Sequence, residues 1–238
     1  MNIYVVDILP LQSRERFYGL LSFVPPERRD KIERCRYRDD ACLSLAAGLL
    51  LEYGLNRRGL TLLKGGNGTY VKLIYGKCGK PALAGQEGIY FNLSHSGRYA
   101  AVIFADTQAG IDIEQIKEAR VKVARRFFMQ EETEALLREE PQRQDVLFAE
   151  LWSRKESCIK AVGAGMVLPL DSFSVLGEQA VFRDKEPAGE PLFLKTWKDL
   201  PPGYCLSVCA GRPCDGEPQL LKAEQFFRVK TFESAGGI

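Results

Sequence analysis

The sequence lacks several features that mark common functional classes. No apolar run approaches the ~20 residues that a membrane-spanning helix needs. Residues 1–7 have neither the basic region nor the longer apolar core of an export signal, and their pattern is more typical of a strand. The formal net charge of +2 is too small to indicate a general nucleic-acid binder. We therefore expect a cytoplasmic protein with no membrane contact and no nucleic-acid partner.

Cysteine is present, but its pattern favours neither disulfides nor zinc. The seven cysteines are an odd number, and without a sign of export free thiols are expected. A zinc site would have to combine Cys78, Cys205, Cys209 and Cys214. Residues 204–210 have the pattern of a strand, in which Cys205 and Cys209 lie about 13 Å apart at ~3.3 Å per residue. One tetrahedral ion would hold both only if the strand bent, so buried reduced thiols are the simpler interpretation.

The length and the pattern of elements predict an α+β fold. A chain of 238 residues suffices for one large domain or two small ones. Strands are predicted at 1–7, 60–63, 69–75, 89–93, 99–105, 111–114, 173–176, 180–182, 192–197 and 204–210, and helices at 12–24, 26–34, 41–53, 121–128, 130–138 and around 146–163. We place a junction at 106–110, between an N-terminal half (1–108) and a C-terminal half (109–238). The residues from about 213 are expected to form a peripheral tail.

A carboxylate on the apolar face of a predicted helix is the first candidate site residue. At about 100° per residue, Glu156 shares a face with Trp152 and Ile159. Lys155 and Lys160 lie at the two edges of that face. One interpretation is a surface glutamate paired with Lys160 at i,i+4, a weak interaction. The other is that Glu156 faces a site, where the lysines place positive charge beside it.

Two further acids alternate with isoleucines in the predicted strand at 111–114. On a strand, Ile111 and Ile113 point one way, while Asp112 and Glu114 project together, about 6.5 Å apart at Cα. Their repulsion is either screened on an exposed face or neutralised by a divalent cation. Mg²⁺ typically takes one or two carboxylates together with phosphate oxygens and water. A third acid, Glu156, favours the metal site.

His95 is the only histidine and lies in a predicted turn. A Ser-His-Asp hydrolase would need a distant serine, because the adjacent Ser94 and Ser96 do not meet the ring productively, and no Gly-x-Ser-x-Gly motif is present. A surface role and hydrogen bonding to a phosphate or base are both open. Arg28 and Lys31, three residues apart, suit one phosphate, although a solvated helix face is the ordinary role of such a charged segment.

Four stretches, taken together, resemble the 4′-phosphopantetheinyl transferases of the Sfp type. They are residues 26–31 (PERRDK), 79–81 (GKP) with 91–96 (FNLSHS), 110–114 (GIDIE) and 152–160 (WSRKESCIK), continued by 168–175 (LPLDSFSV). The likeness covers roughly residues 1–212, and the last two main motifs are the specific ones. It implies a pseudo-two-fold α+β fold of two similar halves, each a small, mostly antiparallel sheet packed with helices. Coenzyme A would bind in the cleft between the halves.

The resemblance also implies residue roles. Asp112, Glu114 and Glu156 would hold Mg²⁺, with Mn²⁺ as an alternative. Glu156 is the candidate general base, and Lys160 would act at the leaving phosphate. The residues implied to bind coenzyme A are Arg28, Lys31, Ser44, Gly79, Lys80, Pro81, Ser94, His95 and Lys155. Arg28 stands where the family frequently has a lysine, and Cys42 and Leu43 stand where it often has basic residues.

The implied reaction moves the 4′-phosphopantetheine arm of coenzyme A onto a serine of an acyl or peptidyl carrier protein and releases 3′,5′-ADP. We expect a monomer. The expected docking face for the acidic carrier combines basic and apolar residues, namely Arg120, Lys122, Arg125, Arg126, Phe127, Phe128 and Met129. Two other classes are considered. One is a Mg²⁺-dependent nuclease or phosphohydrolase, which the near-neutral charge disfavours. The other is a non-catalytic module that binds coenzyme A without turnover.

Overall fold

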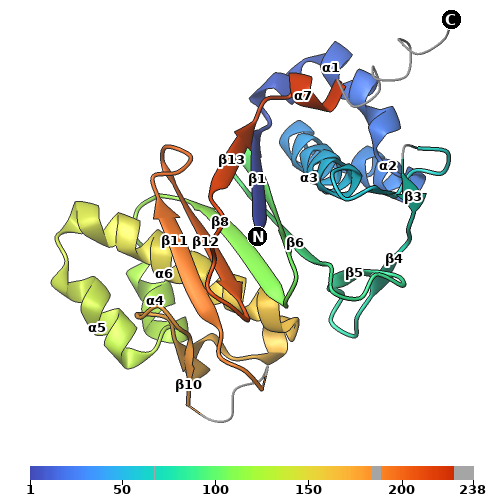
Figure 1. The fold of residues 1–238 in the computed structure, drawn as a ribbon. Coiled ribbons are helices and arrows are strands. Elements are labelled where there is room, and N and C mark those ends of the chain that lie inside the picture. Colours follow the sequence, from blue (N-terminus) through green and yellow to red (C-terminus); the bar gives the residue numbers. More distant parts are fainter. Residues whose placement is uncertain (67, 184–188, 228–238) are drawn as a thin grey trace, which may run out of the picture.

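Two small β-sheets face each other at the centre of the molecule, and one long helix covers the outer side of each sheet (Figure 1). The computed structural model describes residues 1–66, 68–183 and 189–227. From one side to the other, the layers are α3 (Arg38–Asn56), the first sheet, the second sheet and α6 (Pro141–Val162). The expected α+β fold, with small sheets packed against helices in each half, is confirmed.

The first sheet has the strand order β13-β1-β7-β6. Its strands are β1 (Asn2–Asp7), β6 (Tyr90–Ser96), β7 (Tyr99–Ala105) and β13 (Pro218–Leu221). The β1–β7 and β6–β7 pairs are antiparallel, whereas β13 joins β1 in parallel. This half also contains α1 (Arg14–Leu20), α2 (Pro26–Glu33), 3-10 turns at Leu9–Gln12 and Leu21–Phe23, and the short strands β2 (Leu60–Thr61), β3 (Thr69–Tyr70), β4 (Leu73–Tyr75) and β5 (Pro81–Leu83). The continuous helix expected at 12–24 is therefore limited to α1 with a 3-10 turn on each side.

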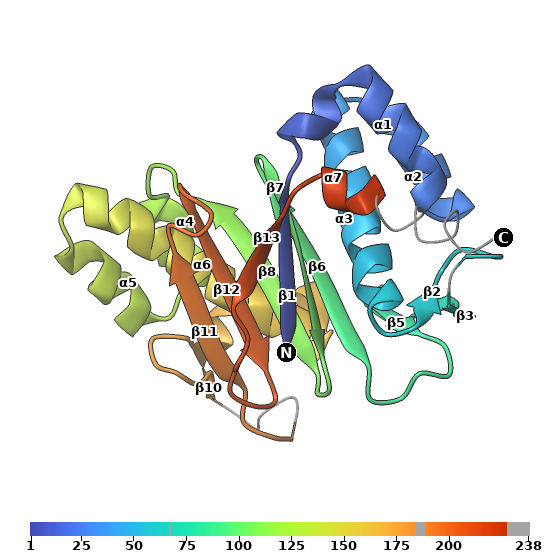
Figure 2. The same ribbon diagram turned by 45° about the horizontal axis from the view of Figure 1, so that its top comes forward.

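The second sheet is antiparallel, with the order β11-β12-β8. Its strands are β8 (Ala109–Gln115), β11 (Phe193–Lys198) and β12 (Tyr204–Ala210). The rest of this half consists of α4 (Val121–Phe127), α5 (Gln130–Arg138), 3-10 turns at Gly165–Val167 and Leu170–Ser172, and the pair β9 (Phe173–Ser174) and β10 (Val181–Phe182). Figure 2 shows α4 to α6 on one side of the molecule and α1 to α3 on the other, with the sheets between them.

The alternation of apolar residues explains the layers. On β1, Ile3 and Val5 lie in the core between the two sheets, whereas Tyr4 and Val6 lie in the core beneath α3. On β8, Ile111 and Ile113 enter the core between the sheets, as the sequence predicts. Every second residue of β8 is therefore directed to the opposite face, where α6 packs.

The segment from residue 213 returns to the first half, so the expected peripheral tail is wrong for residues 213–227. Strand β13 adds to β1, and α7 (Glu224–Phe227) brings Phe226 into the core with Tyr53. Residues 228–238 lie outside the described part of the chain. The division near residue 108 stays a prediction, but one strand of the first sheet comes from the end of the sequence.

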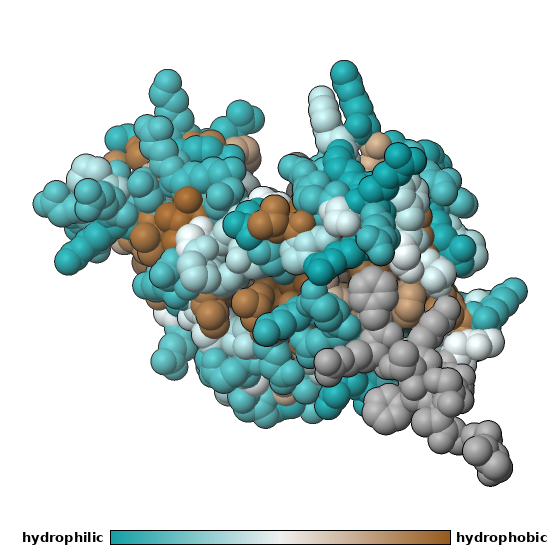
Figure 3. Space-filling model, turned by 90° about the horizontal axis from the view of Figure 1, so that it is seen from above, coloured by the Kyte–Doolittle hydropathy of each residue, from teal (hydrophilic) through white to brown (hydrophobic). Residues whose placement is uncertain are grey.

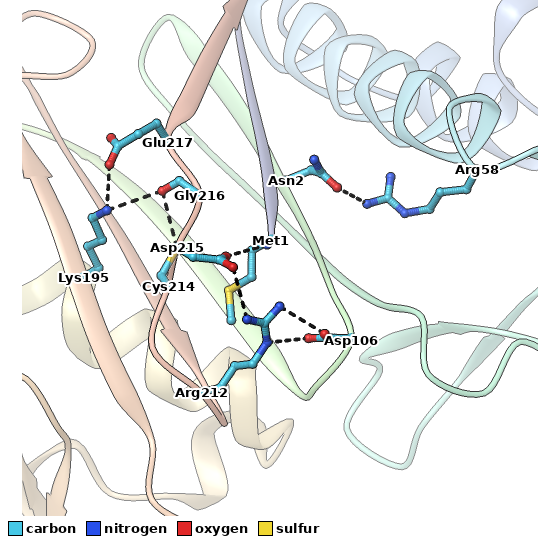
Figure 4. A network of polar contacts seen from close by, with 10 residues as sticks. All are labelled: Met1, Asn2, Arg58, Asp106, Lys195, Arg212, Cys214, Asp215, Gly216 and Glu217. Carbon is cyan, nitrogen blue, oxygen red and sulfur yellow. Dashed lines mark hydrogen bonds and ion pairs between the residues drawn. The ribbon is translucent and has the colours of Figure 1, made fainter.

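Polar contacts hold this returning segment in place (Figure 4). Arg212 makes two bonds to Asp106, of 2.7 and 3.0 Å, and a third to Asp215 at 3.3 Å. The amino group of Met1 lies 2.8 Å from Asp215, and these cations lower the pKa of Asp215 to about 2. Gly216 passes so close to the Met1 carbonyl that an added Cβ would come within 2.6 Å of that oxygen.

The surface seen from above is mostly hydrophilic, and its hydrophobic residues form small separate patches (Figure 3). An indentation separates two parts of this surface in the same view. Within the described residues, no helix combines the length and apolar character required to cross a bilayer.

Candidate active site

The predicted acids and bases meet where β6 and β8 come together, in front of α6. Strand β6 is the last strand of the first sheet and β8 is the last strand of the second, so the two edges face each other. Side chains of β8 and α6 supply the acids and Lys160, while β6 supplies hydroxyl groups. The site is thus shared between the two halves of the chain.

Asp112 is the most buried of the three candidate acids. It is 6% exposed, and its Oδ1 accepts hydrogen bonds from Lys160 Nζ at 2.6 Å and from Ser94 Oγ at 2.8 Å. Burial raises the pKa of Asp112, while Lys160 and the hydrogen bonds act in the opposite direction. Because the ammonium lies directly on the carboxylate, we describe the pair as ionised, with Lys160 compensating the buried charge.

Glu114 and Glu156 surround this pair as half-buried carboxylates. Glu114 Oε2 accepts a bond from Ser96 Oγ at 3.2 Å, and its Oε1 lies 3.9 Å from Arg120. Glu156 makes no hydrogen bond or ion pair with any described residue. The pKa of each glutamate is raised, first by burial and then by the charge of Asp112. Three acids from two elements therefore share one electrostatic environment, as the sequence predicts.

This donor set suits a hard divalent cation. It consists of oxygen ligands whose mutual repulsion a cation would relieve. In the described part of the chain, no group of three or more His, Cys, Asp or Glu side chains is placed to hold a metal ion by itself. Mg²⁺ sites in proteins are commonly of this incomplete kind, because Mg²⁺ binds one or two carboxylates and takes its remaining ligands from phosphate and water.

Gly110 allows β8 to approach α6, a role that the sequence analysis missed. A Cβ at this position would lie 2.1 Å from the Ser157 carbonyl oxygen and 2.4 Å from the Ala161 nitrogen. Only glycine permits such contact between strand and helix backbone. The close approach brings Asp112, two residues further along β8, within reach of Lys160. A glycine directly before the acidic pair was the available signal.

The expectation that Lys155 binds coenzyme A is wrong. Its side chain is fully buried, and its ammonium group donates to the carbonyls of Leu170 at 2.7 Å and Phe173 at 2.6 Å. The third partner is Glu132 Oε2 at 2.8 Å, which is also fully buried. These three acceptors satisfy the ammonium, so Lys155 joins α6 to α5 and to the segment before β9 instead of reaching a ligand.

On the other side of β6, basic and polar groups without protein partners form a candidate anion site. Arg28 is partly buried and makes no ion pair or hydrogen bond with the described residues; burial lowers its pKa. Ser44, on α3, has a buried hydroxyl without a partner among them. The pKa of His95 is lowered by desolvation and then by the charges of Lys160 and Lys31. An anion would supply the missing partners of Arg28 and Ser44.

The loop at 79–81 connects a separate cavity to the C-terminal end of α6. Lys80 Nζ donates to the carbonyls of Ala161 at 2.7 Å and Ala109 at 3.2 Å, and burial lowers the pKa of Lys80 to about 8. A cavity of about 640 Å³ lies beside it, lined by Lys80, Pro81 and the beginning of β6. Asp112, Glu114 and Glu156 do not line this cavity.

Carboxylates paired with a lysine, beside basic groups with unsatisfied donors, have the chemistry that suits binding of a phosphate compound. Comparison with known proteins gives the family. The model of the 4′-phosphopantetheinyl transferase superfamily matches residues 108–209, and the model of the N-terminal part of 4′-phosphopantetheinyl transferases matches residues 11–108.

Several curated relatives match nearly the whole chain. The 4′-phosphopantetheinyl transferase Sfp of Bacillus subtilis (strain 168) is 36% identical over 214 residues, which are 89% of this chain and 92% of the relative. The 4′-phosphopantetheinyl transferase psf-1 of Bacillus pumilus is 32% identical over 228 residues, 91% of this chain and 93% of the relative. The chain therefore belongs to the 4′-phosphopantetheinyl transferases and is of the Sfp type.

Members of this family use coenzyme A and act on carrier proteins. Among solved structures, the holo-[acyl-carrier-protein] synthase of Thermotoga maritima matches 45% of this chain and 64% of its own, with a TM-score of 0.34 and 16% identity. A match of this size carries no weight for fold or function.

Proposed function

We propose that this transferase moves the 4′-phosphopantetheine arm of coenzyme A to a serine hydroxyl of an apo acyl or peptidyl carrier protein, in a Mg²⁺-dependent reaction that releases 3′,5′-ADP. The observation that carries this proposal is the bond of Lys160 to Asp112 inside the acid cluster, next to the unpartnered donors Arg28 and Ser44. Coenzyme A carries a diphosphate and a separate phosphate on its ribose. The acid cluster with Lys160 suits the diphosphate, and the unpartnered donors suit the ribose phosphate.

The anion site is assigned to the 3′-phosphate of coenzyme A. Arg28 and Lys31 lie one helical turn apart on α2, and Ser44 and His95 provide a hydroxyl and an imidazole from α3 and β6. Arginine presents two donors to one phosphate, so a partly buried Arg28 suits this role. Gly79, Lys80, Pro81 and Ser94 are assigned to the adenine side. Because the Lys80 ammonium already has two carbonyl partners, its contribution is to hold the loop.

The residues proposed to hold Mg²⁺ are Asp112, Glu114 and Glu156, and Mn²⁺ suits the same oxygen ligands. When bound, the cation neutralises charge on the pyrophosphate and so makes phosphoryl transfer easier.

Glu156 and Lys160 are assigned to the proton transfers. The carboxyl group of Glu156 has no hydrogen-bond or ion-pair partner among the described residues, so an oxygen of it is available to accept a proton. It would take the proton of the carrier serine as the oxygen attacks the β-phosphorus. Lys160 would stabilise the phosphate of 3′,5′-ADP as the bond to phosphorus breaks.

The docking of an acidic carrier is assigned to the basic surface of α4. Lys122, Arg125 and Arg126 are exposed there, whereas Phe128 and Met129 are buried and unavailable for docking. Arg120 is exposed as well, and it lies over the rings of Phe148 and Trp152 and 3.9 Å from Glu114. A cytoplasmic location, a monomeric state and the lack of nucleic-acid and membrane partners remain parts of this proposal.

A mass measurement tests the reaction. The protein is mixed with coenzyme A, Mg²⁺ and several apo-carrier proteins, and one or more carriers should gain the mass of the arm. The matched variant Asp112→Ala should give no modified carrier while unfolding cooperatively as the wild type does. Binding of coenzyme A without any carrier modification would contradict the proposal and favour a non-catalytic module. Cleavage of plasmid DNA with Mg²⁺ would favour the nuclease.

A further inference from the structure

Strands β6 and β8 meet through side chains instead of through their backbones. Three amide groups of β8 donate to side chains of β6: Ile111 N to Asn92 Oδ1 at 3.0 Å, Ile113 N to Ser94 Oγ at 3.4 Å, and Gln115 N to Ser96 Oγ at 3.3 Å. Each pair is 19 residues apart in the sequence, so the strands run parallel and in register. We refer to Asn92, Ser94 and Ser96 as the side-chain ladder.

The two serines of the ladder have a second function that Asn92 does not share. Ser94 Oγ donates to Asp112 at 2.8 Å, and Ser96 Oγ donates to Glu114 at 3.2 Å. A hydroxyl has one proton and two lone pairs, so it donates to the acid while it accepts the amide of the following residue. The same two hydroxyls therefore satisfy the edge of the second sheet and orient two acids.

Ser96 is the member of the ladder that can be tested separately. Ser94 also accepts a bond from Lys160 at 3.0 Å and belongs to the proposed binding site. Ser96 is half-buried at the end of β6, and its described partners are Glu114 and the Gln115 amide. The other oxygen of Glu114 has only Arg120, at 3.9 Å, which is too long for a hydrogen bond.

We propose that Ser96 is a positioning residue, which holds Glu114 in the orientation that lets it join Asp112 and Glu156 around the cation. This inference rests on the metal assignment in the proposed function. It gives the side-chain ladder a function that hydrogen bonds between the two backbones would not provide. Groups that orient metal ligands commonly change metal affinity 10–100-fold when they are removed, roughly the effect expected here.

The test measures cation binding through protein stability as well as through activity. Mg²⁺ is titrated at a fixed saturating concentration of coenzyme A, and the thermal midpoint is recorded for each variant, since a ligand that binds the folded state stabilises it by RT ln(1 + [L]/Kd). For Ser96→Ala, the Mg²⁺ concentration needed for the same rise of the thermal midpoint as in the wild type should be about 10-fold higher or more. Ser96→Thr, which keeps the hydroxyl, should restore the wild-type value. Carrier modification is followed over the same Mg²⁺ range and should shift in parallel.

Ser207→Ala is the matched control. Ser207 is a buried hydroxyl on β12 that bonds to Ser153 and Thr196 but to no carboxylate. Its removal should lower the thermal midpoint without changing the Mg²⁺ dependence. If Ser96→Ala does not fold, Ser96→Cys provides the comparison, because a thiol of similar size is a weak donor and should raise the Mg²⁺ requirement partly.

Two outcomes distinguish a failure of the role of Ser96 from a failure of the proposed function. If the wild type modifies carriers and responds to Mg²⁺, but Ser96→Ala requires the same Mg²⁺ concentration to within about twofold, Ser96 is structural only and the inference is overturned. If the wild type itself shows neither Mg²⁺-dependent stabilisation nor carrier modification, the proposed function fails, and the role of Ser96 fails with it.

Discussion

The two long helices hold equivalent places in the fold but contribute differently to the site. Helix α3 is buried along most of its length, and its side chain at the site is one unpartnered hydroxyl, Ser44. Helix α6 has an apolar buried face too, yet it also carries Lys155, Glu156 and Lys160. The part of the site beside α3 thus consists of a few donors without partners, which suit an anion. The part beside α6 consists of closely spaced charged groups. Binding and chemistry should therefore respond separately to mutation.

The difference between the effect on catalysis and the effect on coenzyme A binding should be largest for a substitution of Glu156. Glu156→Gln should lower the rate of carrier modification about 10²–10⁴-fold, the usual contribution of a general base, while coenzyme A still binds. Without divalent cation, the variant should also unfold at a slightly higher temperature near pH 7. The reason is that burial and Asp112 raise the pKa of Glu156, so keeping it ionised lowers the stability of the folded wild type.

The pH dependence gives the control for this prediction. A raised carboxyl pKa means that the folded protein loses stability as the pH rises through that pKa. The advantage of Glu156→Gln should therefore shrink as the pH falls and Glu156 becomes protonated. Kinetics with calorimetry between neutral and mildly acidic pH measures both effects. Wild-type turnover in the variant would remove Glu156 from the chemistry.

Lys155 and Glu156 are neighbours on α6 but differ in role. Glu156 belongs to the acid cluster, whereas Lys155 is buried in an ion pair. Lys155→Met should lower the free energy of unfolding by about 3–5 kcal/mol, because it leaves the buried charge of Glu132 without an opposite charge. The double variant Lys155→Met with Glu132→Gln should recover only part of this loss, because the two Glu132 oxygens accept the amides of Met129 and Val175 and a glutamine keeps only one acceptor oxygen. Denaturant unfolding measures both variants. A single variant as stable as the wild type would show that the buried pair is not needed.

On the binding side, Arg28 should affect affinity more than rate. Arg28→Ala should weaken coenzyme A binding about 10–100-fold, the effect of losing a hydrogen bond to a charged group. Dephospho-coenzyme A, which lacks the 3′-phosphate, should bind wild type and variant alike. Arg29→Ala is the control, because the Arg29 guanidinium already bonds to the Val24 carbonyl. Calorimetric titration distinguishes these cases, and an equal loss for both ligands would place Arg28 elsewhere.

The smallest effect is expected at the contact between the C-terminal segment and the junction. Arg212→Ala removes exposed bonds to Asp106 and Asp215, and exposed ion pairs contribute about 0–1 kcal/mol. The free energy of unfolding should fall by no more than this, and carrier modification should be unchanged. A clear loss of activity would mean that the returning segment controls the site.

Much of the site could be predicted from local patterns. Period-two alternation placed Ile111 and Ile113 in the core and Asp112 and Glu114 together, and the structure agrees. Helical periodicity placed Glu156 on the apolar face of its helix, and the resemblance to the transferases implied that it joins the two acids. These predictions hold because strand and helix geometry are set by the chain's own backbone, which needs no information about distant partners.

Other features depended on residues far apart in the sequence. Periodicity put Lys155 and Lys160 on the two edges of one helix face. It did not show that Lys155 would be buried in an ion pair with Glu132 from α5. Nor did it show that β13 adds to β1, because edge strands accept any extended segment that reaches them.

The amino-acid sequence by itself determined the elements, the acidic motif and the family of this chain, since each rests on local patterning or on motif order. Only the tertiary structure decided which lysine serves the site, why Gly110 must lack a side chain, and how Ser94 and Ser96 join the two sheets at the acids. The physical reason is that burial and pairing are properties of the neighbours a residue meets after folding. Those neighbours come from parts of the chain that no local pattern connects.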